Sequence, residues 1–304
     1  GEEVRPEVDV VSRLDHEGRV FLVLAGPEVK PEPEHVAAPP APESIHLIVG
    51  QRSDPGRVRE LNEDSVLAIQ VAPTYQSVTS PVLGLFAVAD GMGGHDGGEI
   101  ASKLALQVLA DHTLRTILIP ELAGELRLEE DILAHLRRAA LAANDAVYLA
   151  RQKRGNDMGT TLTTILVRDR LLFIAHVGDC RAYRWSDTGL EQLTTDHSVV
   201  ASMIAHGQVP PDEIYTHPHR SVIYRSVGDQ PTVEVDGDML PLEPGNRIVV
   251  CSDGLWEMVR SDGIADVMMQ EANPQVACDL LVRLANASGG EDNISVVIVQ
   301  VEAA

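Results

Sequence analysis

Five aspartates stand beside hydrophobic segments that are spread over most of the chain. They are Asp64 in RELNED, Asp90 in LFAVADGMGG, Asp179 in IAHVGDCR, Asp253 in IVVCSDGLW and Asp292 in GGEDNISVVIV. A single aspartate after a strand is commonly a turn residue, because its carboxylate accepts nearby backbone N–H bonds. Five of them at strand ends predict one cluster of carboxylates, which repel one another unless a cation lies among them. Because Mg²⁺ and Mn²⁺ prefer hard oxygen ligands, the pattern predicts a site that holds several metal ions.

Strand-like and helical segments alternate over residues 45–301. Runs typical of strands cover residues 46–49, 65–71, 83–89, 160–167, 171–177, 181–185, 233–239, 247–251 and 294–301. Helical periodicity covers residues 98–116, 129–154, 261–271 and 274–287. The helices come in groups between groups of strands, without a regular strand-helix-strand repeat. The order predicts an α+β fold, a four-layer α-β-β-α sandwich of two antiparallel sheets flanked by helices.

A Pro- and Ala-rich stretch divides the chain. Residues 30–44, KPEPEHVAAPPAPES, contain little to bury and predict an extended linker. Residues 1–29 before it contain two apolar runs around an Asp-His-Glu-Gly turn, which predict a β-hairpin. Because a lone hairpin is marginally stable, we interpret this segment as a remnant of, or a lead-in to, another module.

The charge of the chain excludes some partners. There are 46 acidic and 24 basic residues, for a net charge of -22. Binding to duplex nucleic acid needs clustered Lys and Arg, so we expect no nucleic acid partner. The same charge disfavours an anionic membrane surface, and no apolar run is long enough for a transmembrane helix. With three cysteines that form no C-x-x-C pair and no signal peptide pattern, we expect reduced thiols and a cytoplasmic location.

The DGMGG turn, residues 90–94, follows the most hydrophobic predicted strand. Glycines there let the backbone turn tightly and bring carbonyl groups close to a bound ion. A glycine-rich turn can instead cradle a phosphate, but neither G-x-x-x-x-G-K-[ST] nor G-x-G-x-x-G occurs at this position. By itself the turn does not decide between a metal site and an ordinary tight turn.

The RELNED segment, residues 59–64, combines an arginine with an acidic pair just before a strand. Arg59 has a planar guanidinium that suits bidentate binding of a phosphate. Glu63 and Asp64 suit a metal ion or its waters. A solvated charged loop is the alternative reading of this segment taken alone.

These motifs occur together with MGTT, HVGDCR, CSDGLW and EDNISV in a fixed order. In that order the chain strongly resembles the metal-dependent protein serine/threonine phosphatases, the PPM or type 2C family, in their bacterial form. The resemblance covers roughly residues 45–301, so we expect a catalytic domain over residues 45–302. It implies hydrolysis of phosphoserine and phosphothreonine by direct attack of a hydroxide that bridges two Mn²⁺ or Mg²⁺ ions, the arrangement suited to in-line displacement.

The resemblance also implies a set of metal ligands. Asp90 corresponds to the carboxylate that bridges the two ions. Asp253 and Asp292 complete the protein ligands of one ion. The Gly91 carbonyl and Glu63, directly or through water, serve the other.

Three further roles follow from the resemblance. Arg59 corresponds to the family's phosphate-binding arginine. Asp64 corresponds to an acceptor that orients metal-bound water rather than to a direct ligand. Asp179 corresponds to the carboxylate that holds a third, more weakly bound metal in bacterial members.

The general acid stays unassigned. Met92 stands where eukaryotic members carry a histidine proposed for that role, and bacterial members commonly share the methionine. We interpret the histidines around the motifs, among them His95, His176 and His197, as structural, which leaves metal-bound water as the candidate acid. Residues 196–228 resemble the family's flap, a loop beside the metals that selects substrates, and a rigid connector is the alternative.

Two other functions compete with an active phosphatase. One is a catalytically inactive PPM-like regulatory binding module, whose mark would be lost ligands. The other is a different two-metal phosphoesterase such as a nuclease, which would need a basic groove. Expected partners are phosphorylated proteins, including a Ser/Thr kinase and its targets, and we expect a monomeric catalytic domain.

Overall fold

The computed structural model describes residues 9–14, 20–25, 44–71, 74–75, 78–79, 82–93, 97–125 and 128–304. The chain divides into two units, Gly1–Pro42 and Glu43–Ala304. In the first unit β1 (Asp9–Leu14) and β2 (Val20–Ala25) pair antiparallel. The assignment of this hairpin to another module stays a prediction. The predicted linker lies outside the described residues except for Ser44.

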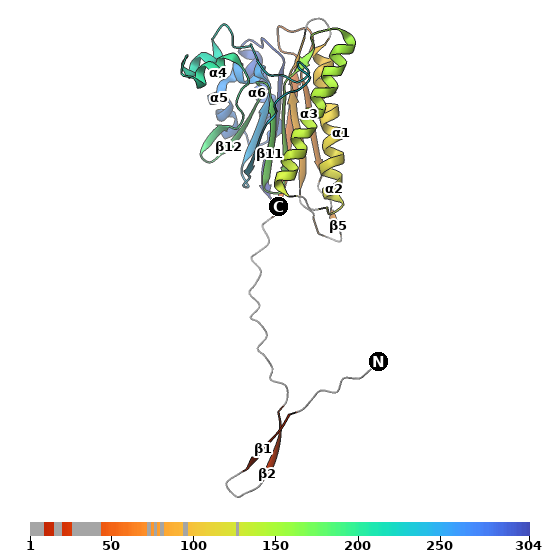
Figure 1. The fold of residues 1–304 in the computed structure, drawn as a ribbon. Coiled ribbons are helices and arrows are strands. Elements are labelled where there is room, and N and C mark those ends of the chain that lie inside the picture. The colour runs from red at the N-terminus through yellow and green to blue at the C-terminus, as the bar shows by residue number, and fades with distance from the viewer. Residues whose placement is uncertain are drawn as a thin grey trace. The chain divides into compact units, whose positions relative to one another are not determined.

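Two five-stranded sheets form the centre of the second unit (Figure 1). In spatial order the first consists of β14 (Asp236–Pro241), β11 (Leu171–Val177), β10 (Leu162–Arg168), β7 (Leu83–Ala89) and β4 (Ser65–Val71). The second consists of β13 (Gly189–Gln192), β12 (Arg181–Ser186), β15 (Arg247–Cys251), β16 (Ile294–Ala303) and β3 (Ile45–Asp54). Every neighbouring pair in both sheets is antiparallel.

Helices cover the outer face of each sheet. Against the first sheet lie α1 (Gly98–Thr113), the π-helical turn η1 (Leu114–Leu118), α2 (Ile119–Leu122) and α3 (Glu129–Arg154). Against the second lie α5 (Asp253–Gln270) and α6 (Pro274–Ala287). Short elements complete the unit: β5 (Thr74–Tyr75), β6 (Val78–Thr79), β8 (Gly91–Met92), β9 (Gly159–Thr160), α4 (Val199–Ala205) and η2 (Pro211–Tyr215). The predicted four-layer α-β-β-α sandwich is confirmed.

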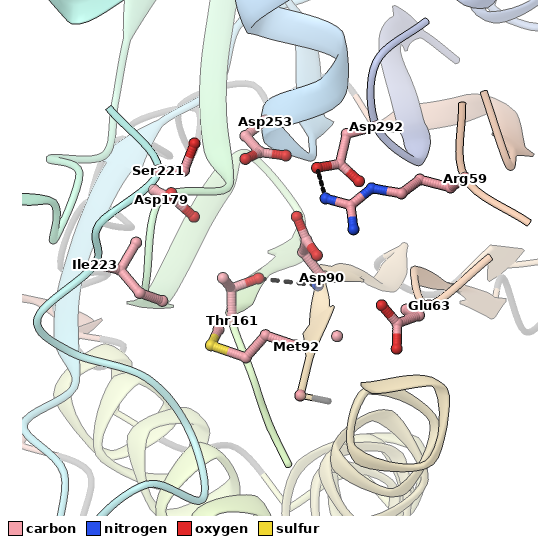
Figure 2. A pocket seen from close by; sticks show the side chains of 12 residues that line it. Arg59, Glu63, Asp90, Met92, Thr161, Asp179, Ser221, Ile223, Asp253 and Asp292 are labelled. Carbon is pink, nitrogen blue, oxygen red and sulfur yellow. Dashed lines mark hydrogen bonds and ion pairs between the residues drawn. The ribbon is translucent and has the colours of Figure 1, made fainter. Parts of the chain in front are cut away.

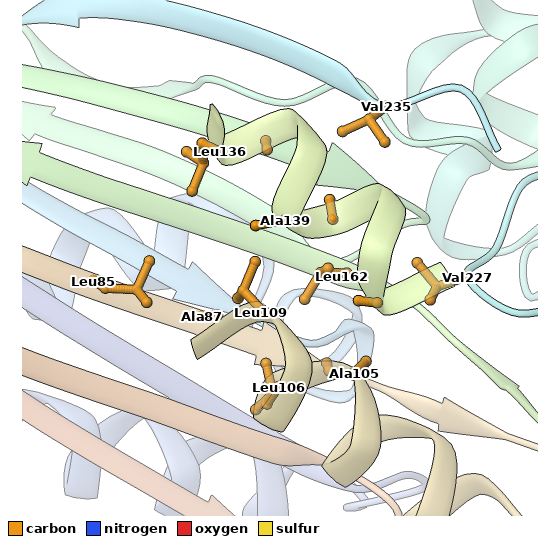
Figure 3. Close-up of a cluster of buried hydrophobic side chains, with 14 of the residues drawn as sticks. Leu85, Ala87, Ala105, Leu106, Leu109, Leu136, Ala139, Leu162, Val227 and Val235 are labelled. Carbon is orange, nitrogen blue, oxygen red and sulfur yellow. The ribbon is translucent and has the colours of Figure 1, made fainter. Parts of the chain in front are cut away.

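Three hydrophobic clusters hold the four layers together. Along β7, Leu85 packs against the helices, and its neighbour Phe86 packs against the other sheet. This alternation follows from the two-residue period of a strand. Because both faces are covered, the strand reads as an unbroken apolar run in the sequence. Figure 3 shows Leu85, Leu109 and Leu136 meeting in the cluster between α1, α3 and the first sheet.

Helix α3 has the bounds predicted from its periodicity, and it ends at Gly155, which adopts a left-handed conformation with φ of 68°. Its inward face also contains a buried asparagine that the apolar pattern does not reveal. Asn144 accepts a hydrogen bond from Gly228 N at 2.8 Å and donates one to Gln230 O at 3.2 Å. The helix therefore anchors the end of the segment resembling the flap.

Several predicted boundaries were wrong; the strand expected at residues 46–49, for example, is β3, Ile45–Asp54. The helix expected at residues 261–271 is the second part of α5, and a break at Arg260, where φ is 58°, separates it from a first helical part that begins at Asp253 and was not predicted. The strand expected at residues 160–167 is divided between β9 and β10, because Thr161 N bonds to Asp90 O outside the sheet ladder. The strand expected at residues 233–239 is Asp236–Pro241, whose pairing begins at Asp236 with His176.

A buried ion pair joins β12 to the start of residues 196–228. Arg181 Nη2 lies 2.6 Å from Asp196 Oδ2, and Arg181 Nη1 donates to Tyr183 Oη at 3.1 Å. The guanidinium carbon also lies 3.5 Å from the centre of the Trp256 ring. In the part of the chain described, no helix is both long and apolar enough to cross a bilayer.

We expect Arg181→Met to reduce the free energy of unfolding by about 3–5 kcal/mol, because the buried Asp196 carboxylate would lose its partner. Urea unfolding followed by circular dichroism measures the change. The control is Arg184→Gln on the same strand, where Arg184 Nη2 lies 2.6 Å from the exposed Glu191. Loss of that pair should cost less than about 1 kcal/mol. Equal effects of the two substitutions would contradict the role of the buried pair.

Candidate metal centre

The antiparallel ladders bring distant aspartates to one end of the first sheet. Ser65, the first residue of β4, pairs with Ala89, the last residue of β7. Asp64 and Asp90 therefore leave the same end of neighbouring strands. On the other side of β7, Leu162 at the start of β10 pairs with Val177 at the end of β11, two residues before Asp179.

The second sheet supplies the remaining aspartates in the same way. Arg181 at the start of β12 pairs with Cys251 at the end of β15, and Cys251 pairs with Val296 near the start of β16. Asp253 follows β15 as the first residue of α5, and Asp292 precedes β16. Because β15 and β16 run in opposite directions, Asp253 after the one and Asp292 before the other lie at the same end of the second sheet.

One pocket collects seven of the eight predicted site residues (Figure 2). Its lining consists of Arg59, Glu63, Asp90, Gly91, Met92, Gly93, Thr161, Asp179, Ser221, Ile223, Asp253 and Asp292. The eighth predicted residue, Asp64, is buried next to the pocket, and its Oδ2 accepts a hydrogen bond from Ser252 Oγ at 2.8 Å. This position is compatible with the predicted role of Asp64, which is to orient metal-bound water and not to bind a metal directly.

The MGTT motif fixes the backbone of Asp90. Thr161 Oγ1 accepts a hydrogen bond from Asp90 N at 2.9 Å. Thr160 Oγ1 and Thr161 N donate to Asp90 O at 2.8 and 2.9 Å. With its amide and carbonyl held in this way, the side chain of Asp90 is directed into the pocket (Figure 2).

Two further residues that sequence reasoning missed hold the acidic side chains in place. Asn293 Oδ1 accepts from Glu63 N at 2.8 Å, and Asn293 Nδ2 donates to Pro55 O and Leu61 O at 3.0 and 2.9 Å. Ser252 bonds to Asp64 as described above. Each stands directly beside a candidate aspartate, in CSDG and in EDN, so adjacency to Asp253 and Asp292 was the signal available in the sequence.

Gly91 has no room for a side chain. A Cβ atom at this position would overlap the Gly98 carbonyl and approach Glu63 O at 2.6 Å. Its amide also donates to Glu63 O at 3.2 Å. The close approach brings the start of α1, the Glu63 loop and the Asp90 turn together, which only glycine permits here.

The carboxylates raise one another's pKa. Burial raises the pKa of Asp90 well above its ordinary value, and the charges of Asp64, Asp253 and Asp179 add to the effect. Burial also raises the pKa of Asp64 and of Asp253 to about 6, with the charge of Asp292 contributing to both. Burial and then Asp253 raise the pKa of Asp179. Ionisation of these carboxyl groups is therefore unfavourable in the protein unless a cation lies among them.

The residues fit divalent cations. Asp64 Oδ1 and Asp253 Oδ1 are buried without a hydrogen-bond partner, as expected of oxygens reserved for an ion or its water. Among the described residues, no three His, Cys, Asp or Glu side chains surround one point closely enough to form a complete metal cage. Mg²⁺ does not require such a cage, because it usually keeps several waters and uses one or two carboxylates. Carboxylate and carbonyl oxygens also suit Mn²⁺.

Arg59 provides the positive charge at the pocket's mouth. Its Nη2 donates to Asp292 Oδ2 at 2.6 Å, and this bond raises the pKa of the guanidinium, because it outweighs the lowering of the pKa by burial. A guanidinium carries five N–H donors, so the bond to Asp292 leaves others for a phosphate. Arg59 is half exposed, with 51% of its side chain accessible.

The segment resembling the flap contributes Ser221 and Ile223 to the opposite side of the pocket (Figure 2). It is tied to α5 through Arg220, whose Nε lies 3.1 Å from Glu257 Oε2. None of the histidines in the described ranges lines the pocket. His176 bonds to Thr163 and Thr195, and burial lowers its pKa to about 3. His95 lies outside the described residues.

Comparison with known proteins identifies the family. A family model described as protein phosphatase 2C matches residues 61–286. The chain belongs to that family. The serine/threonine phosphatase stp of Listeria welshimeri is 32% identical over 251 residues, which cover 82% of this chain and 94% of that protein. The predicted PPM assignment and the enzyme class, a protein serine/threonine phosphatase, are thereby confirmed.

Mycobacterial relatives extend the comparison. The serine/threonine protein phosphatase PstP of Mycobacterium tuberculosis is 37% identical over 262 residues, covering 85% of this chain and 46% of that protein. A crystal structure of the PstP catalytic domain, described as a complex with two manganese ions, has a TM-score of 0.70 and 32% identity. It covers 85% of this chain and 100% of that one.

A streptococcal structure is also similar. The serine/threonine phosphatase of Streptococcus agalactiae has a TM-score of 0.73 at 30% identity, and the match covers 84% of this chain and 99% of that one.

The raised pKa values predict how the metal-free phosphatase responds to pH. A carboxyl group with a higher pKa in the folded than in the unfolded chain stabilises the fold at low pH. That contribution is lost as the pH rises from about 4, the ordinary aspartate value, through the folded pKa of about 6 at Asp253. With a chelator present, we expect Asp253→Asn to melt at least about 2 °C above the unsubstituted protein at about pH 7.5.

Thermal melts at several pH values measure this difference. It should shrink towards about pH 5, where more of the Asp253 carboxyl is protonated. It should reverse when saturating Mn²⁺ is added, because the ion stabilises the folded state that binds it. A lower melting temperature for metal-free Asp253→Asn at every pH would show that the carboxylate cluster is not under electrostatic stress.

Proposed function

We propose that this phosphatase hydrolyses phosphoserine and phosphothreonine in proteins by direct attack of a hydroxide held between two Mn²⁺ or Mg²⁺ ions. The observation that carries the proposal is the convergence of Arg59 with buried and partly buried carboxylates in one pocket. Bound ions would supply a nucleophile at neutral pH and neutralise the phosphate. The crystal structure of the PstP catalytic domain described with two manganese ions supports the same requirement.

The ligand roles in this proposal are those that the family resemblance implies, and the positions of the residues support them. Asp90, whose backbone is fixed on both sides, would hold both ions. Asp253 and Asp292 would hold one ion from the second sheet. The Gly91 carbonyl and Glu63 would hold the other from the first sheet, where Gly91 N already bonds to Glu63 O.

Arg59 and Asp64 act on the substrate and on water. Arg59 binds the phosphoryl group through the N–H donors that Asp292 leaves free. Asp64 is held by Ser252 through Oδ2, and its unpartnered Oδ1 is available to accept a proton-bearing water and orient it. Neither residue needs to act as a covalent nucleophile.

Asp179 holds a third ion in the proposal. It lies in the same pocket, is 5% exposed, and its backbone carbonyl accepts a hydrogen bond from Trp256 Nε1 at 3.0 Å. Its side chain therefore faces the pocket from a fixed backbone.

We also propose the substrates, the location and the oligomeric state of the catalytic domain. Its substrates are phosphorylated proteins, including a Ser/Thr kinase and the targets of that kinase. We place the catalytic domain in the cytoplasm as a monomer. A catalytically inactive regulatory module is the competing function, and it is opposed by the retention of every candidate ligand.

We expect Asp253→Asn to lower kcat for a phosphopeptide by at least about 100-fold, because a neutral amide cannot replace a charged metal ligand. Mn²⁺-dependent release of inorganic phosphate measures the rate. Asp266→Asn, on the exposed side of the same helix, is the matched control and should retain full activity. If the unsubstituted protein releases no phosphate at any Mn²⁺ or Mg²⁺ concentration, the inactive-module reading is correct.

Arg59→Ala should raise KM for a phosphopeptide by about tenfold or more, because charge-assisted hydrogen bonds to the phosphate are lost. Steady-state kinetics give the change, and circular dichroism checks that the fold is intact. Arg59→Lys keeps the charge without the bidentate geometry and should recover only part of the loss. Unchanged KM and kcat in Arg59→Ala would remove this residue from the phosphate site.

Asp179→Ala should reduce the number of Mn²⁺ ions bound from three to two while the tighter pair remains. Isothermal titration calorimetry measures the stoichiometry independently of turnover. The Mn²⁺ concentration needed for half-maximal activity should also change. Identical titrations for the variant and the unsubstituted protein would rule out a third ion at Asp179.

A further inference from the structure

A second charged hollow lies between the edge strand β3 and helix α6, outside the metal pocket. Its lining includes Arg52 and Arg57 from the β3 side and Arg283 from α6, and we call it the arginine hollow. On α6 the lining residues Asp279, Val282, Arg283 and Asn286 recur at helical spacing, so they share one face. The hollow has a volume of about 600 Å³, within the range of ligand sites.

The three guanidinium groups are available for a ligand. About half of the arginines whose side chains are described pair with a carboxylate, as Arg59 does with Asp292 and Arg170 with Glu243. Arg52, Arg57 and Arg283 are exposed and make no ion pair with any described residue. Three arginines without an ion pair therefore line the same hollow.

The two carboxylates of the hollow are already engaged by neutral groups. Asp54 Oδ1 accepts from Gly56 N at 3.0 Å and from Asn286 Nδ2 at 3.1 Å. Asp279 Oδ1 accepts from Gln275 Nε2 at 3.3 Å. Neither carboxylate lies within ion-pair distance of the three arginines, whose N–H donors remain free for an anion.

The arginine hollow and the metal pocket are lined by residues that are close together in the sequence. Arg57 lines the hollow and Arg59 lines the pocket, and residues two positions apart lie at most about 7 Å apart along an extended chain. Arg57 N donates to Gly290 O at 2.7 Å, in the loop that leads to Asp292. A single polypeptide in extended conformation can reach both sites within a few residues.

We propose that the arginine hollow binds a second phosphoryl group on the same substrate polypeptide, so that the enzyme prefers multiply phosphorylated segments. This inference rests on the proposed hydrolysis of phosphoproteins. Arginine is suited to the task because its planar fork binds phosphate oxygens bidentately. The excess of positive charge in the hollow gives complementarity to a dianion, on a chain whose overall charge of -22 otherwise repels one.

The experiment compares the binding of peptides that carry phosphonate analogues, which the Mn²⁺-loaded enzyme cannot hydrolyse. Fluorescence anisotropy measures Kd for peptides with one analogue and for peptides with two at a series of spacings. At the best spacing, we expect the second analogue to tighten binding about tenfold, or about 1.4 kcal/mol. The gain should shrink at high salt, because the arginines are exposed.

Two double substitutions test whether the arginine hollow causes the tighter binding of peptides with two analogues. Arg57→Gln/Arg283→Gln should remove the preference for the second analogue, while Arg138→Gln/Arg154→Gln on α3 should retain it with the same change in net charge. Equal Kd values for both peptide types would overturn the proposal. So would a preference that survives Arg57→Gln/Arg283→Gln, for example if the arginines only prevent edge-to-edge pairing of β3.

The result of this binding experiment does not depend on whether the protein releases phosphate from phosphopeptides. Because the analogues are not hydrolysed, the affinity difference is measured whether or not the protein turns over phosphopeptides. Failure of phosphate release with a retained preference would leave the arginine hollow as a binding site and refute only the proposed hydrolysis.

Discussion

Mutual repulsion among buried carboxylates is the constraint on which the site and much of its surroundings depend. Asp64, Asp90, Asp179 and Asp253 are gathered at one end of two sheets, and burial together with their shared charge raises the pKa of each. Such a cluster is stable as a set of anions only when cations join it. The fold therefore has to hold the carboxylates in place against a force that separates them.

The groups that hold them are neutral. Hydroxyls of Thr160, Thr161 and Ser252 and the amide of Asn293 bind backbone or carboxylate atoms of the site. A Lys or Arg in these positions would neutralise the cluster and compete with metal ions, whereas hydroxyl and amide donors orient the ligands and leave their charge available. Among the described residues that line the pocket, Arg59 is the single arginine; it lies at the exposed rim and bonds to Asp292.

The same acidic composition shapes the rest of the surface. The chain has 46 acidic and 24 basic residues, and about half of the arginines whose side chains are described form ion pairs. The buried pair of Arg181 with Asp196 fixes the start of the segment that carries Ser221 and Ile223. In the hollow between β3 and α6, by contrast, three arginines form no ion pair with a described residue. Residues 54–59 contribute to the lining of both the metal pocket and that hollow, so one short segment joins the two.

The sequence by itself determined the elements, the layer order and the candidate ligands. The alternation of apolar residues predicted β7 and α3 with their observed bounds, and the motif order predicted the family, because these signals are local or survive in linear order. Only the tertiary structure decided that Ser252 and Asn293 support the acidic residues, that α5 begins at Asp253, and that Arg52, Arg57 and Arg283 share a hollow. Those facts depend on which strands become neighbours. Pairing partners separated by hundreds of residues, such as Asp54 with Ile294, leave no periodic trace in a single sequence.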